Sequence, residues 1–145
     1  MNKTNIPNQC FETRIAVRFA DTDANGHVFF ANYLTYFDTA FLDYLKAVDY
    51  EFKRFTDQGI NFYYAEALSR YKAGAEFGET LRVLVKISKF GNTSFTIEFT
   101  TIGLESDTLI NTGHIVAVIV DFQSGQPVPI PPDFIAAVKR YEDKE

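Results

Sequence analysis

Hydrophobic and polar positions alternate near the start of the chain and then change period. Residues 12–20 alternate apolar with polar or small side chains, which is the period-two pattern of a half-buried strand. From Asn32 to Val48 the apolar positions recur every three to four residues, which predicts one long helix with a wide apolar face. The chain therefore begins with a strand and a long helix, joined by a short loop.

The part of the chain after this helix is mostly strand-like. Residues 51–59 predict a short helix that ends at Gly59, and the pattern of residues 60–74 is ambiguous. Apolar side chains then alternate with polar ones over residues 81–87 and 95–99, and the Gly-Asn pair between these segments suits a hairpin turn. These segments predict antiparallel strands that follow one another.

Two elements close the sequence. Residues 114–122, "HIVAVIVDF", form an almost continuous apolar run rich in β-branched side chains, which predicts a strand covered on both faces. A turn region rich in Pro and Gly follows. Pro131, Pro132 and Asp133 then begin a short amphipathic helix that continues to Tyr141.

One long apolar helix followed by antiparallel strands restricts the possible folds. The helix can be covered only if the sheet curls around it, so the sequence predicts an α+β fold with a curled antiparallel sheet and a central helix. Such a sheet keeps a free edge strand, and two copies can join their sheets edge to edge. We therefore expect a homodimer.

The composition is typical of one folded domain, which we assign to residues 1–145. Hydrophobic residues make up 46% and charged residues 23%, and a chain of 145 residues buries enough surface for a full core. Aromatic residues make up 16%, with no Trp, which indicates a Phe-rich core or pocket. The net charge of −5 argues against nucleic acid, but local cations can still hold a small anionic molecule.

The cysteine content and the first residues indicate the compartment. Cys10 is the only cysteine, so neither an internal disulfide nor a cysteine-based metal site can form. Residues 1–10 contain no apolar run like that of a secretory signal, and no segment of the sequence approaches a membrane span. We therefore expect a soluble, cytoplasmic protein without a metal ion.

The loop before the long helix contains an unusual number of residues that could take part in catalysis. Residues 19–33, "FADTDANGHVFFANY", contain Asp21 and Asp23 and continue into apolar residues. Asp, Thr, Asn and Gly are ordinary turn residues, so both acids can simply shape a turn or cap the helix. A carboxylate beside an apolar slot is also a candidate base or nucleophile, and amides at a helix start can stabilise an oxyanion. Together, an acid and such amides suit acyl transfer.

This loop resembles a known active-site signature. The pattern F-x-D-T-D-x-x-G-H-V-x-x-A-N-Y-L-x-Y-F-D is similar to that of the 4-hydroxybenzoyl-CoA thioesterase family, and close in style to the Tol–Pal-associated acyl-CoA thioesterases. The resemblance extends from Phe11 to Tyr141, because the later strands and the closing helix also match. It implies the hot-dog fold, in which a curled antiparallel sheet wraps around one long helix.

The resemblance also implies roles for the loop residues. The second acid of the D-x-D pair is Asp23, which would attack the thioester carbonyl or activate water; the family leaves this choice open. The oxyanion donor would be the backbone N–H of Phe30. Asp21 would shape the loop, and Gly26 would permit its tight turn.

Two residues near the predicted site have two interpretations each. His27 can hydrogen-bond the loop, or it can contact the acyl or thiol group of a substrate. Asp38, at a position where relatives often carry an acid, can line the pocket or hold the helix to a neighbouring element. Asn32 and Tyr33 would anchor the start of the helix.

The substrate site is implied by the same resemblance. Helix residues would form the acyl pocket and the other subunit would close it, because hot-dog sites form at a dimer interface. Coenzyme A phosphates need cations or backbone amides, which the turn between the two later strands offers. The expected substrate-binding residues are Tyr33, Phe37, Asp38, Phe62, Tyr63, Lys89, Asn92 and Thr93.

The sequence therefore predicts an acyl-CoA thioesterase. It would hydrolyse a short- or medium-chain or aromatic acyl-CoA to the free acid and CoA, without a cofactor, as a homodimer or homotetramer. One alternative is a thioesterase that acts on an acyl-carrier protein or releases a polyketide chain. The other is a non-catalytic acyl-CoA-binding module, which the presence of Asp23 disfavours.

Overall fold

The computed structural model describes residues 10–143. Two predictions depend partly on residues outside this range, namely the lack of a signal-like run in residues 1–10 and the domain bounds 1–145. The elements are β1 (Phe11–Ala16), a short 3-10 turn (Phe19–Asp21), α1 (Asn32–Ala47), α2 (Phe52–Asp57), β2 (Ile60–Tyr71), β3 (Thr80–Phe90), β4 (Ser94–Gly103), β5 (Leu109–Asp121) and α3 (Pro132–Glu142).

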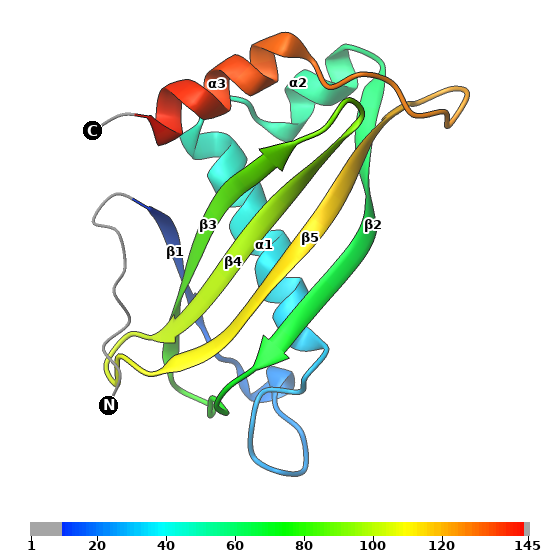
Figure 1. Cartoon of the computed structure of the whole chain (residues 1–145). Helices are drawn as coiled ribbons and strands as arrows, with labels where there is room; N and C mark the ends of the chain where they lie inside the picture. Colours follow the sequence, from blue (N-terminus) through cyan, green and yellow to red (C-terminus); the bar gives the residue numbers. More distant parts are fainter. Residues whose placement is uncertain (1–9, 144–145) are drawn as a thin grey trace.

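The strands form one antiparallel sheet in the order β1-β3-β4-β5-β2. Figure 1 shows that this sheet curls around α1, while α2 and α3 lie at one end of the molecule and the loop before α1 lies at the other. Within residues 10–143, β1 and β2 are the two edge strands of this sheet. The predicted α+β hot-dog architecture is confirmed.

The apolar face of α1 forms the centre of the core. Phe37 and Phe41 are fully buried on this face, and the Phe37 ring stacks on Phe99 of β4 at a centroid distance of 4.3 Å. Gly113 of β5 leaves room for this packing, because a Cβ there would lie 2.8 Å from the Phe37 ring. Much of the high Phe content is therefore used in the contact between helix and sheet.

Three elements differ from their predicted form. The first strand ends at Ala16 rather than near residue 20, because the chain turns at Phe19–Asp21. The ambiguous segment after Gly59 is the edge strand β2. The prediction that β5 is covered on both faces is met in part, because one face is buried and the outward side chains are half-buried in the single chain.

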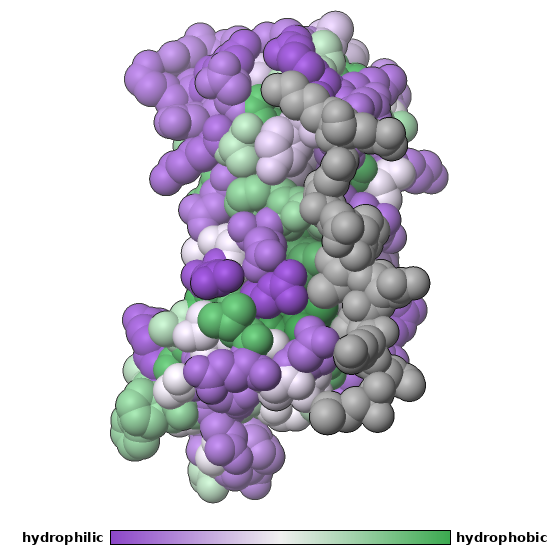
Figure 2. Space-filling model, turned by 90° about the vertical axis from the view of Figure 1, so that its left-hand side faces the viewer, coloured by the Kyte–Doolittle hydropathy of each residue, from purple (hydrophilic) through white to green (hydrophobic). Residues whose placement is uncertain are grey.

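The surface differs between the two ends of the molecule. Figure 2 shows the face that carries β1, where hydrophilic side chains dominate the upper end and several hydrophobic groups reach the surface in the lower half. Phe19 and Phe77, which are 76% and 62% exposed, form an edge-to-face pair on the surface. Large aromatic side chains therefore remain exposed beside the loop that precedes α1.

Candidate active site

The first acid of the D-x-D pair holds the loop to α1. Asp21 is only 5% exposed, and its carboxylate accepts hydrogen bonds from the Arg18 guanidinium and the Tyr36 hydroxyl, each at 2.9 Å. Its backbone carbonyl accepts from the Phe29 N–H and from Asn32 Nδ2, again at 2.9 Å. Asp21 is therefore fully engaged in shaping the loop, and Asn32 anchors the helix start.

We expect Asp21 to make the free energy of unfolding depend on pH. Burial by itself raises the pKa of Asp21, but hydrogen bonds from Arg18 and Tyr36 bring it below the ordinary 3.8. The folded pKa therefore lies below the unfolded one, so the stabilisation is complete above pH 3.8 and is lost as pH falls through the folded pKa. Urea unfolding at a series of pH values from neutral downward measures the free energy of unfolding of wild type and of Asp21→Asn. If the difference between the two proteins stays constant as pH falls below the ordinary pKa of Asp, the prediction is wrong.

The second acid forms a tight turn but keeps one oxygen free. Asp23 Oδ1 accepts a hydrogen bond of 2.9 Å from the Asn25 N–H, and the turn closes through the Gly26 N–H and the His27 carbonyl. Gly26 has a φ of 80°, which favours glycine. Within residues 10–143, Asp23 Oδ2 has no hydrogen-bond partner, and no Lys, Arg or His forms an ion pair with the carboxylate. Asp23 is thus both a turn residue and a free carboxylate.

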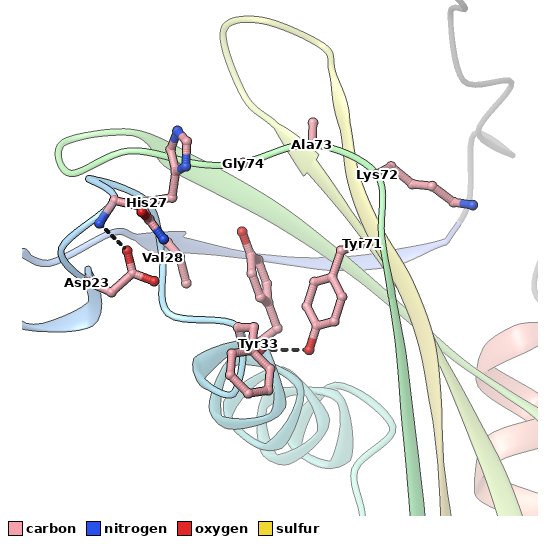
Figure 3. A pocket seen from close by; sticks show the side chains of 10 residues that line it. Asp23, His27, Val28, Tyr33, Tyr71, Lys72, Ala73 and Gly74 are labelled. Atoms are coloured by element: carbon pink, nitrogen blue, oxygen red, sulfur yellow. Dashed lines mark hydrogen bonds between the residues drawn. The ribbon is translucent and has the colours of Figure 1, made fainter.

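A cavity of about 440 Å³ opens beside this carboxylate. Figure 3 shows the loop with Asp23 and His27 on one side and the segment from Tyr71 to Gly74 on the other, with Tyr33 extending from α1 between them. Four residues expected at the site therefore share one cavity: Asp23, His27, Phe30 and Tyr33. The full lining is Asp23, Asn25, His27, Val28, Phe30, Tyr33, Tyr71, Lys72, Ala73 and Gly74.

The backbone N–H of Phe30 lies in a turn at the start of α1. The Asn32 N–H donates to the Phe29 carbonyl at 2.8 Å, so Phe30 is the second residue of this turn and its own N–H is not part of the turn bond. Among residues 10–143 this N–H has no acceptor. Phe30 and Asp23 line the same cavity, and a free amide near a helix start is suited to binding an oxyanion.

His27 contributes its ring to the cavity wall. The side chain is exposed and packs against Gly74, where a Cβ would lie 3.0 Å from the ring. In the part of the chain that the structure describes, its ring nitrogens make no hydrogen bond. Among the described residues the His27 ring therefore makes no hydrogen bond to the loop, which leaves contact with a substrate as a proposal.

Tyr33 places a buried hydroxyl beside the same cavity. The residue is 2% exposed, and its hydroxyl has no hydrogen-bond partner among the described residues. Burial raises the pKa of Tyr33 to about 12, so the hydroxyl stays protonated at neutral pH. Its ring packs edge-to-face on Tyr36 and Tyr71, at 5.8 Å and 5.6 Å.

A second cavity of about 410 Å³ lies further along the edge between α1 and β2. It contains three more of the expected residues, Asp38, Phe62 and Tyr63. Asp38 accepts a 2.6 Å hydrogen bond from Tyr64 of β2, so it both lines this cavity and holds the helix to the edge strand. Burial, and then the Asp38 carboxylate, raise the pKa of Tyr64 well above its usual range. The full lining is Asp38, Leu42, Phe52, Asn61, Phe62, Tyr63 and Tyr64.

The other expected residues lie away from both cavities. Phe37 belongs to the core, because α1 directs it at Phe99 rather than at the loop. Lys89, Asn92 and Thr93 lie at the β3–β4 hairpin, where the Asn92 carbonyl accepts from the Ile130 N–H. Figure 1 shows this hairpin at the end of the sheet opposite the loop, so within one chain these residues do not reach Asp23.

Sequence reasoning missed the wall that faces Asp23. Tyr71, Lys72, Ala73 and Gly74 form it, and they lie at the end of the segment whose pattern was ambiguous. The available signal was the spacing of Tyr71 and Ala73, which would share one face of a continuing strand, although β2 ends at Tyr71. Without the strand assignment, that spacing could not be connected to the loop.

Two further observations concern the described residues only. No helix within residues 10–143 is both long enough and apolar enough to cross a membrane. No group of three or more His, Cys, Asp or Glu side chains in this range is arranged to hold a metal ion.

Comparison with known proteins places this chain among thioesterases. The model of the family described as "Thioesterase-like superfamily" matches residues 17–138. The Escherichia coli O6:H1 "Acyl-CoA thioester hydrolase YbgC" is 24% identical over 130 residues, covering 90% of this chain and 96% of the relative. The "1,4-dihydroxy-2-naphthoyl-CoA hydrolase" of Thermosynechococcus vestitus is 29% identical over 126 residues, covering 85% and 84%.

A solved structure supports the same fold. The crystal structure of the DHNA-CoA thioesterase from Staphylococcus aureus superimposes with a TM-score of 0.84 at 23% identity, covering 91% of this chain and 90% of that one. The family match spans most of the chain, including the loop with both acids. The chain therefore belongs to the thioesterase-like superfamily and is a thioester hydrolase with the hot-dog fold.

Proposed function

We propose that this protein hydrolyses an acyl-CoA thioester to a carboxylic acid and free CoA, with Asp23 and the backbone N–H of Phe30 as its reacting groups. One observation carries the proposal: Asp23, whose carboxylate keeps a free oxygen, and Phe30, whose backbone N–H has no acceptor among the described residues, line the same cavity. The names of the Escherichia coli and Thermosynechococcus vestitus relatives, both acyl-CoA hydrolases, support the substrate class.

The two groups supply what thioester hydrolysis requires. Asp23 either attacks the carbonyl carbon, forming a mixed anhydride that water then hydrolyses, or takes a proton from the water that attacks. In both routes the carbonyl oxygen gains negative charge, which the Phe30 N–H stabilises by donating a hydrogen bond. The CoA thiolate leaves and takes up a proton.

A second copy of the chain completes the site in this proposal. β2 is an edge strand, and the two cavities lie at opposite ends of it. Antiparallel pairing of two β2 strands about a twofold axis brings the Phe62 and Tyr63 end of one copy beside the Tyr71 end of the other. The same symmetry brings the β3–β4 hairpin of the second copy, with Lys89, Asn92 and Thr93, toward the Asp23 cavity.

The lining of the two cavities supports an aromatic or a short- to medium-chain acyl group. Phe30 and Tyr71 border the first cavity, and Phe52 and Phe62 border the second. Aromatic walls bind flat apolar groups well. The 1,4-dihydroxy-2-naphthoyl-CoA hydrolase among the relatives acts on such a group by name.

The experiment that tests the proposal is thiol release from a panel of short, long and aromatic acyl-CoAs. We expect turnover of at least one aromatic or short- to medium-chain ester, and sedimentation equilibrium of the same preparation should give a dimer or tetramer of the 16.5 kDa chain. No hydrolysis by the folded protein would reject acyl-CoA as the substrate. The acyl-carrier-protein ester of the same acids then becomes the next substrate to test.

A further inference from the structure

A hydrogen bond crosses the cavity from the edge strand to the turn before α1. The hydroxyl of Tyr71, the last residue of β2, donates to the carbonyl oxygen of Phe30 at 2.8 Å, across 41 residues of sequence. We infer that Tyr71 is a positioning residue, which holds this turn so that the Phe30 N–H faces the bound thioester. The inference rests on the proposed function, in which that N–H is the oxyanion donor.

Among residues 10–143, the turn is anchored on both sides of Phe30, and at Phe30 itself Tyr71 alone provides a side-chain hydrogen bond. The Asp21 carbonyl accepts from the Phe29 N–H and from Asn32 Nδ2, each at 2.9 Å. Phe30 has no comparable anchor, because its ring is 61% exposed and its N–H has no acceptor within residues 10–143. In that range the Tyr71 hydroxyl is the only side chain that hydrogen-bonds the Phe30 backbone.

Aromatic packing holds the Tyr71 hydroxyl in place. The Tyr71 ring lies 5.6 Å from the buried ring of Tyr33 and 6.4 Å from Phe30, both edge-to-face. Tyr33 is in turn fixed against Tyr36 of α1. The hydroxyl therefore approaches the Phe30 carbonyl from a ring that packs on Tyr33 and Phe30, while Tyr71 as a whole is 47% exposed. Replacing Tyr71 with Phe keeps this packing and removes only the hydrogen bond.

The same bond helps to set the width of the cavity. One wall contains Asp23, Val28 and Phe30, and the other is the segment that begins at Tyr71. The Val28 N–H joins the walls by donating to the Ala75 carbonyl at 2.8 Å, and the Tyr71 hydroxyl joins them a second time. The two attachments fix the separation of the walls, and the Tyr71 bond also restrains the Phe30–Ala31 peptide, which is next to the peptide that carries the Phe30 N–H.

The expected effect is on turnover rather than on substrate binding. Removing an oxyanion donor typically lowers kcat by roughly a hundredfold to a thousandfold. Tyr71→Phe keeps the Phe30 N–H as a donor but removes one restraint on the turn that carries it. We therefore expect kcat to fall about tenfold while KM changes less than about twofold. A residue that only stabilises the fold would lower the unfolding midpoint without this separation of kcat from KM.

The test measures kcat and KM for Tyr71→Phe, with the acyl-CoA that the wild type hydrolyses best. Tyr141→Phe is the matched control, because this tyrosine packs on Tyr44 of α1 and lines neither cavity. A second arm uses Phe30→Pro, which removes the N–H and suits the second position of a turn. If Tyr71 acts through that N–H, adding Tyr71→Phe to Phe30→Pro causes little further loss.

The outcomes separate this inference from the proposed function. A tenfold loss of kcat in Tyr71→Phe that disappears in the Phe30→Pro background supports the positioning role. A kcat within about twofold of wild type overturns it, as does a loss that persists in full beside Phe30→Pro. Turnover that survives Asp23→Asn rejects the proposed function instead, while turnover that needs Asp23 but not the Tyr71 hydroxyl rejects the positioning role alone.

Discussion

Asp23→Asn is expected to lower kcat for acyl-CoA hydrolysis by about a hundredfold or more, the scale for losing a base or nucleophile. The amide has nearly the same shape as the carboxylate, and its oxygen can still accept the hydrogen bond that Asn25 donates. It cannot attack a thioester carbonyl or take a proton from water. Steady-state thiol release from wild type and variant measures the loss.

The fold should be unaffected by this change, which a matched control can demonstrate. Asp23 is only half-buried and forms no ion pair among the described residues, so the unfolding midpoint should stay close to that of wild type. Asp57→Asn makes the same chemical change on exposed α2, where Asp57 pairs with Lys53, and should leave kcat unchanged. Wild-type turnover in Asp23→Asn would show that another group performs the chemistry.

Phe37→Ala is expected to lower the free energy of unfolding by about 3–5 kcal/mol, the range for removing a large buried aromatic side chain. Phe37 is 0% exposed and stacks on Phe99 with an interplanar angle of 7°. Its removal leaves a cavity between α1 and the sheet that neither element can close without moving. Urea unfolding with a fixed m-value measures the change.

An exposed phenylalanine provides the control for this prediction. Phe122, after β5, is 66% exposed, so Phe122→Ala should change the free energy of unfolding by less than about 0.5 kcal/mol. Residual Phe37→Ala protein that remains folded should keep most of its kcat, because Phe37 lines neither cavity. A loss of less than about 1 kcal/mol would mean that the helix and sheet repack around the missing ring.

The main elements and the loop chemistry were readable from the sequence for physical reasons. The recurrence of apolar residues from Asn32 onward can only describe a helix with one buried face, and α1 indeed begins there. Asp21 and Asp23 were both plausible as turn residues, and the structure shows both in the turn. Which of the two carboxylates keeps a free oxygen depends on Arg18 and Tyr36, because both side chains donate hydrogen bonds to the Asp21 carboxylate.

The remaining features depend on contacts between distant segments. Phe37 and Tyr33 lie on the same helix and look alike as pocket candidates, but the curl of the sheet places Phe99 opposite the first and Tyr71 opposite the second. The opposing wall of the cavity was missed for a similar reason. Its position relative to Asp23 follows from the β2–β5 register, which the ambiguous pattern of residues 60–74 did not define.

The two attachments across the cavity have a consequence for how the protein folds. The Tyr71 hydroxyl joins the loop before α1 to the far end of β2, and the Val28 N–H joins it to Ala75 in the segment that follows. We expect both to form after β2 has paired with β5, because that pairing places the end of the strand. The helix can form from local interactions alone, whereas contacts between distant residues form slowly. We therefore expect the loop before α1 to be among the last parts to become ordered during folding. It should also be among the first parts to open locally when the native state is destabilised.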